Sequence, residues 1–256
     1  MLQAHSFLWH YLWLAPHVLQ VALAIFILRR GLHKLFPVFL AYLIFEAIEE
    51  FTLYGMDLLT SVSATAWWGV FCVGLIVEGL LRFALVGELA LHLLRPWPAL
   101  AATGNRLMRG AGVVLVLLAA LAAAYAPIDN PQTAISSRAH ILEQTLYIVL
   151  AGLVLFLFLF AAYFKLTWNS FTFGIALGLG VLSCEHLSAW AITANGGLPD
   201  KRHLLDMVNM GTYQVCVLIW FYYILIPQKI VTKSAVPLPE HNLAIWNQEL
   251  ERLLHQ

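Results

Sequence analysis

The sequence predicts an all-α, polytopic membrane protein folded as a bundle of seven transmembrane helices. Hydrophobic residues make up 61% of the 256-residue chain and charged residues only 11%, whereas a soluble domain has roughly a quarter of its residues charged. Apolar runs long enough to cross a bilayer recur along the chain with short loops between them. The formal net charge is zero, so nothing in it points to nucleic acid as a partner.

Three apolar runs in the amino-terminal part of the chain form the first predicted spans. The first, 11–28, is closed by Arg29 and Arg30. The second, 35–59, and the third, 67–94, have the length of a membrane helix but carry several charged residues. These charges make the second and third spans the first places to look for function.

Four further runs complete the predicted bundle. The fourth, 110–126, consists mainly of Val, Leu and Ala and stops at the turn sequence PIDNP, residues 127–131. The fifth is 139–164, and the sixth, 171–193, ends before an Asn-Gly-Gly turn. The seventh, 204–226, ends before a proline. The loops are short, so we expect residues 1–229 to form a single transmembrane domain.

The basic residues of the loops predict the orientation, because short loops rich in Lys and Arg stay in the cytoplasm. Nine lie after the first, third, fifth and seventh spans and three in the other loops, which places the amino terminus outside and the carboxyl terminus inside a bacterial inner membrane. The nine are Arg29, Arg30, Lys34, Arg95, Arg106, Arg109, Lys165, Lys229 and Lys233, and the three are Arg138, Lys201 and Arg202.

The cytoplasmic tail, 230–256, contains a predicted amphipathic helix over 240–254. Leu243, Trp246 and Leu250 recur at helical spacing on one face, and the other face carries more acid than base. That charge balance does not favour anionic lipids, so the helix is either a structural anchor at the membrane or a docking site for a cytoplasmic partner.

Charged side chains inside the predicted spans are the main functional signal. An ionised group at the centre of a bilayer costs on the order of 2.5 to 3.5 kcal/mol, so such residues usually face the bundle interior. Helix rise places many of them at a similar depth in the outer half, where we expect an outward-facing acidic cavity. The candidate ligand- or ion-binding residues are Glu46, Glu49, Glu50, Glu78, Arg82, Glu143, Tyr147, Glu185 and Tyr213.

These residues leave several interpretations open. Glu78 and Arg82 are four apart and can pair on one helix, and buried polar groups also join helices without any further role. Glu46, Glu49 and Glu50 lie close together on the second span, which we interpret as one polar stripe. A metal ion would need His17, Glu50, Glu185 and His186 to meet at one point, although Glu185 and His186 point about 100° apart. No catalytic set and no cofactor can be named.

The run from Phe45 to Phe51 together with the PIDNP turn is similar to uncharacterised bacterial seven-helix membrane proteins. This resemblance implies a topology and no activity. The topology also resembles that of receptors and rhodopsins, but the last span lacks the lysine that binds retinal. We therefore expect a receptor-like protein that binds a small polar or cationic ligand. The alternatives are a proton- or cation-coupled transporter and a metal-dependent intramembrane hydrolase.

Overall fold

The computed structural model describes residues 6–59, 61–94, 134–194 and 202–226, together with seven single positions between 110 and 125. This part of the chain is all-helical, as predicted, and contains six long helices and one short 3₁₀ turn. Their bounds are α1 Phe7–Arg29, η1 Leu32–Lys34, α2 Pro37–Leu58, α3 Ala64–Leu93, α5 Ala134–Tyr163, α6 Ser170–Ala194 and α7 Arg202–Leu225.

Five of these helices, α1, α3, α5, α6 and α7, are long and apolar enough to cross a membrane. The chain is therefore a multi-pass membrane protein. Helix α2 has 22 residues but is not among the five, because its acids raise its charge. Its charged residues are Glu46, Glu49, Glu50 and Asp57.

The fourth predicted span, 110–126, is described only at isolated positions. Six of them are helical, and the N–H of Tyr125 donates to the carbonyl of Leu121 at 3.0 Å. A seventh span thus stays a prediction. The predicted tail helix, 240–254, lies outside the described residues.

Serine caps begin two of the helices. The Ser6 hydroxyl accepts from the N–H of Trp9, and the Ser63 hydroxyl accepts from the N–H of Ala66, each at 3.2 Å. These bonds satisfy N–H groups that have no partner within the helix. Helices α1 and α3 consequently start four and three residues before the predicted spans, which were placed by hydropathy alone.

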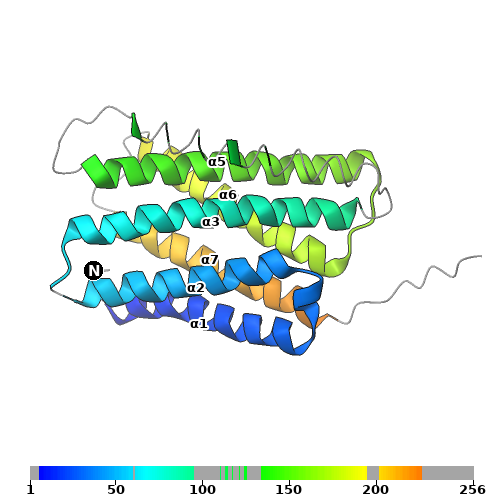
Figure 1. The fold of residues 1–256 in the computed structure, drawn as a ribbon, viewed down its shortest axis with the longest axis horizontal. Helices are drawn as coiled ribbons and strands as arrows, with labels where there is room; N and C mark the ends of the chain where they lie inside the picture. The colour runs from blue at the N-terminus through cyan, green and yellow to red at the C-terminus, as the bar shows by residue number, and fades with distance from the viewer. Residues whose placement is uncertain are drawn as a thin grey trace, which may run out of the picture. The chain divides into compact units, whose positions relative to one another are not determined.

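The described helices form a closed ring in which each packs against two neighbours, in the order α1, α2, α3, α5, α6, α7 and back to α1. Figure 1 shows them running side by side along a common direction. Helices α3 and α6 also meet across the ring. Side chains that point inward from six helices therefore share one interior.

One half of this interior is closed by aromatic side chains. We call the half with the α1–α2 turn the inner half and the other the outer half, after the predicted orientation. Phe36, Phe39, Phe171 and Trp220 form the aromatic layer of the inner half and are at most 2% exposed. The Phe36 and Phe171 ring centroids are 4.6 Å apart, and those of Phe39 and Trp220 are 5.4 Å apart. Leu85 and Leu89 of α3 are fully buried and belong to the same hydrophobic core as these four aromatic residues. The described inner half is therefore a packed apolar core.

Glu88 connects α3 to the start of α2. Its carboxylate accepts from the backbone N–H groups of Val38 and Phe39, at 3.0 and 3.1 Å. Those groups are unpaired donors at a helix start, where the helix dipole also favours a negative charge. Glu88 therefore acts as a cap for a neighbouring helix. This structural role accounts for the presence of one of the acidic residues within α3.

Two glycines let α6 and α7 pack closely. A Cβ added at Gly178 would overlap the ring of Trp220, and one added at Gly174 would overlap Tyr223. We expect Gly178→Ala to lower the free energy of unfolding by about 1 to 3 kcal/mol, the usual cost of overpacking. Unfolding of the detergent-solubilised protein by increasing sodium dodecyl sulfate measures it.

Gly211→Ala is the matched control for this prediction, because a Cβ there meets nothing within 4 Å. Gly211 lies within α7, where alanine is the better helix former, so this variant should be neutral or slightly more stable. Equal losses in both variants would contradict close packing at Gly178.

Candidate functional site

The interior of the bundle holds an ion-paired group that we call the arginine cluster: Arg82, Glu78, Glu46, Tyr42 and Tyr147. The Arg82 guanidinium pairs with Glu78 one turn earlier on α3, which confirms the predicted pair, and lies 3.7 Å from Glu46 of α2. It also lies over the ring of Tyr147 of α5, 4.7 Å from the centroid. All three charged side chains are about nine-tenths buried. Their charges interact strongly, since little water screens them.

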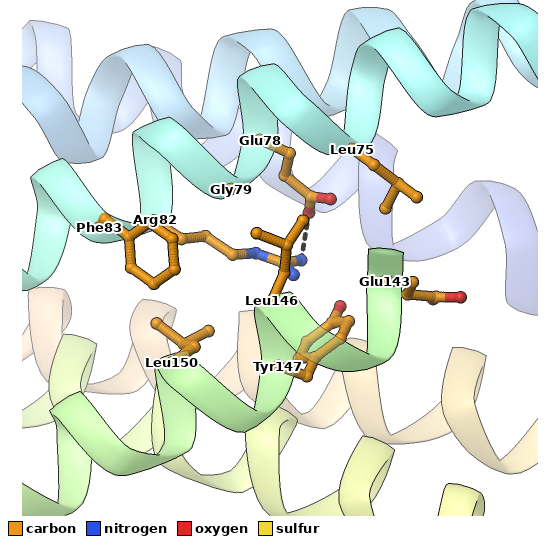
Figure 2. Close-up of a pocket in the computed structure, with 9 residues that line it drawn as sticks. All are labelled: Leu75, Glu78, Gly79, Arg82, Phe83, Glu143, Leu146, Tyr147 and Leu150. Atoms are coloured by element: carbon orange, nitrogen blue, oxygen red, sulfur yellow. Dashed lines mark ion pairs between the residues drawn. The ribbon is translucent and has the colours of Figure 1, made fainter. Parts of the chain in front are cut away.

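Figure 2 shows the Arg82 guanidinium between Glu78 and Tyr147, while the carboxylate of Glu143 points away from it. A cavity of about 10 Å³ remains beside these residues, the space of a single water. Phe83 and Leu150 contribute apolar walls to the same cavity. Only a very small species fits here.

Three buried polar atoms of the arginine cluster have no hydrogen-bond partner among the described residues. They are the hydroxyl of Tyr42, Oε2 of Glu46 and Nε of Arg82. Buried polar atoms are nearly always satisfied by protein or by a bound small molecule such as water. These atoms thus mark unused binding capacity around the guanidinium.

A second group, the histidine cluster, lies toward the outer ends of α5, α6 and α7 and comprises His140, Glu143, Glu185, His186 and Asn209. The Nδ1 of His186 is 2.9 Å from Glu185, and its Nε2 is 3.8 Å from Glu143. Glu143 in turn lies 3.5 Å from His140, which is 66% exposed at its side chain. When the Asn209 side chain is oriented with its amide nitrogen toward Glu185, this nitrogen donates a hydrogen bond to the Glu185 carboxylate. The cluster therefore leads from an exposed histidine to partly buried carboxylates.

Tyr147 joins the two clusters. Its ring stacks on His186 at a centroid distance of 3.7 Å and 17° between planes, while the Arg82 guanidinium lies over the same ring. A stacked imidazole covers one face of the ring, so the guanidinium must occupy the other. Two cationic or potentially cationic groups thus share one tyrosine.

A third group, the α1 cluster, connects α1 with α2 and α7 and comprises Trp13, His17, Gln20, Glu50 and Tyr213. The Trp13 indole N–H donates to Glu50 at 2.8 Å, and His17 lies 4.0 Å from the same carboxylate. The Gln20 amide bonds to His17 and donates to the hydroxyl of Tyr213. His17 also stacks on Tyr213. Nothing in the sequence pairs Trp13 with Glu50, because 37 residues separate them.

The structure corrects the interpretation of Glu46, Glu49 and Glu50 as one stripe. Glu46 points to Arg82, Glu50 to α1, and Glu49 lies against Gly74 in a hollow between α2 and α3. Successive residues of a helix are rotated by about 100°, so neighbours such as Glu49 and Glu50 face different elements. The three acids of the predicted stripe therefore lie in three different environments.

Five of the six other predicted site residues come together in two neighbouring clusters, and the sixth lies in the third cluster. Glu78, Arg82, Glu143, Tyr147 and Glu185 belong to the connected arginine and histidine clusters, and Tyr213 belongs to the α1 cluster. The metal candidates form two pairs, His17 with Glu50 and Glu185 with His186, although we expected the latter two to diverge. In the part of the chain that the structure describes, no three His, Cys, Asp or Glu side chains are grouped to hold a metal ion.

Comparison of the chain with models of known protein families, with curated proteins and with solved structures finds no match. The functional argument therefore depends on the charges of the site. The three clusters together contain five carboxylates, those of Glu46, Glu50, Glu78, Glu143 and Glu185, but only one guanidinium, that of Arg82. Protonating His17, His140 and His186 as well would give four positive charges against five negative.

Proposed function

We propose that this chain is a receptor-like inner-membrane protein of seven spans that binds a small polar or cationic ligand in the acidic interior of its outer half. The excess of carboxylates over cations carries the proposal, because a bilayer interior does not tolerate uncompensated charge. A bound cation or protons held by the carboxylates must supply the difference. The small cavity beside Arg82 favours a ligand about the size of one water molecule, and the orphaned Oε2 of Glu46 is an acceptor for a proton or a cation.

The packed inner half supports sensing over transport. The aromatic layer and the leucines around it leave only two polar side chains among the most buried residues of that half of the described interior: Glu88, which caps α2, and the neutral Thr172 beside Phe171. A transporter needs access to its site from both sides. In the proposed orientation, with the amino terminus outside, the ligand reaches the site past His140. A cytoplasmic partner at the tail would receive the signal.

Two isosteric variants test the site. In lipid nanodiscs, H⁺, Na⁺ and Ca²⁺ are titrated separately while the midpoint of thermal unfolding is recorded, because a ligand that binds the folded state stabilises it. We expect one of these cations to raise the midpoint saturably. Glu185→Gln and Glu50→Gln should each raise its half-saturating concentration about tenfold or more, the effect of losing one charge-assisted interaction.

Asp57→Asn is the matched control, since Asp57 is an exposed acid at the end of α2. This variant should respond as the parent protein does. The same cation response in all three variants, with folding intact, would remove the site. Vesicles reconstituted with the parent protein distinguish the alternative, because we expect no cation flux through a closed inner half, and saturable flux would establish a transporter.

A further inference from the structure

A hollow of about 470 Å³ lies between α2 and α3, on the side of the two helices that faces away from the bundle interior. Its walls are mainly apolar and include Ile48 and Val73, which are 62% and 64% exposed. The volume falls in the range of small-molecule sites, roughly 300 to 1,000 Å³. In the proposed membrane orientation, the hollow opens toward lipid chains and not toward water.

One carboxylate forms part of the floor of this hollow. The side chain of Glu49 lies directly on α3, where the absence of a side chain at Gly74 leaves room for it, and a Cβ at Gly74 would overlap the carboxylate. Glu46 and Glu50, its neighbours in the sequence, are engaged with Arg82 and with α1. Glu49 is thus presented to the hollow and not to the interior clusters.

The second polar group of the hollow also offers only an acceptor. The Thr52 hydroxyl donates its proton to the carbonyl of Ile48 at 2.7 Å, which leaves its lone pairs for another donor. Glu49 and Thr52 are three residues apart and therefore share a face of α2. An apolar hollow with a carboxylate and a hydroxyl acceptor complements a hydrophobic body with a cationic N–H group.

We propose that this hollow binds a membrane-soluble primary amine, with the ammonium group on Glu49 and Thr52 and the alkyl chain along the apolar walls. The site is separate from the acidic interior, and the proposal does not depend on the cation-binding function. In this proposal Glu49, which joins neither Arg82 nor α1, binds a ligand separate from that of the interior. Gly74 is then a positioning residue, since its hydrogen lets the carboxylate reach the hollow.

Dodecylamine is the test ligand, and dodecanol is its neutral counterpart. With the full chain in phosphatidylcholine nanodiscs, dodecylamine should raise the midpoint of thermal unfolding saturably, and dodecanol should not. Dodecylamine should also protect Glu49 from reaction with dicyclohexylcarbodiimide, which attacks carboxyl groups accessible from lipid. Peptide mass spectrometry locates the labelled residue.

Three variants refine the test. Glu49→Gln should raise the half-saturating dodecylamine concentration at least about tenfold, and Thr52→Val, which removes only one neutral acceptor, should raise it less. Gly74→Ala should also weaken binding by displacing the carboxylate. Gly55→Ala is the matched control on α2, because a Cβ there meets nothing within 4 Å. Glu185→Gln should leave the amine response unchanged, which separates this proposal from the interior site.

Three results would overturn the proposal. The first is equal stabilisation by dodecylamine and dodecanol, and the second is an unchanged amine response in Glu49→Gln. The third is a disulfide-linked dimer formed in membranes by Val73→Cys but not by the parent chain, which would show that a second copy occupies the hollow.

Discussion

Replacing Arg82 with methionine is expected to lower the free energy of unfolding by about 3 to 5 kcal/mol at neutral pH, the usual cost of removing one partner of a buried ion pair. The variant leaves Glu78 and Glu46 without their cation in the bundle interior. Its stability should increase as the pH falls, because a protonated Glu78 has no charge left to compensate. Unfolding by sodium dodecyl sulfate over a range of pH measures both effects.

The double variant Glu78→Gln, Arg82→Met identifies the cause of this loss. Removing both charges should recover part of the stability lost in the single variant, and the difference gives the coupling energy of the pair. Arg29→Met is the matched control, since Arg29 is exposed at the end of α1 and should cost little. A loss for Arg82→Met that does not depend on pH or on Glu78 would mean that packing, and not charge, explains it.

Replacing Trp220 with alanine is expected to cost about 3 to 5 kcal/mol, because it opens a cavity in a region without exposure to solvent. The indole packs edge-on against Phe39 and Tyr42, and its N–H donates to the carbonyl of Ile175 at 3.4 Å. Trp220→Phe keeps an aromatic ring and should lose less than half as much.

The vesicle flux assay gives Trp220→Ala a functional consequence. If the aromatic layer closes the inner half, its partial removal should allow slow cation leakage that the parent protein and Trp220→Phe lack. A stability loss below about 1 kcal/mol, together with no leakage, would contradict the central place of Trp220 in this layer.

Hydropathy predicts the described helices well, because apolar length is what a bilayer requires. It does not predict where they begin: Ser6 and Ser63 extend α1 and α3 beyond the apolar runs through hydrogen bonds to the backbone. Gly174 and Gly178 are four residues apart, the spacing typical of a close helix approach, and the side chains of Trp220 and Tyr223 of α7 pack against them.

The candidate site could be predicted only where its partners lie within one helix. Glu78 and Arg82 met that condition. Contacts between helices, such as Trp13 with Glu50, depend on the order of the ring and on helix rotation, which a single sequence does not contain. For the same reason, Glu46, Glu49 and Glu50 of α2 were predicted to form one stripe, whereas each of them contacts a different part of the structure.

The sandwich of Tyr147 between His186 and Arg82 implies antagonism between its two faces. A ring attracts a cation through the electron density above its face, and a cation on one side draws that density away from the other. A positive charge on the His186 side of the ring would therefore weaken the attraction between Tyr147 and the Arg82 guanidinium, which Glu78 and Glu46 hold from α3 and α2.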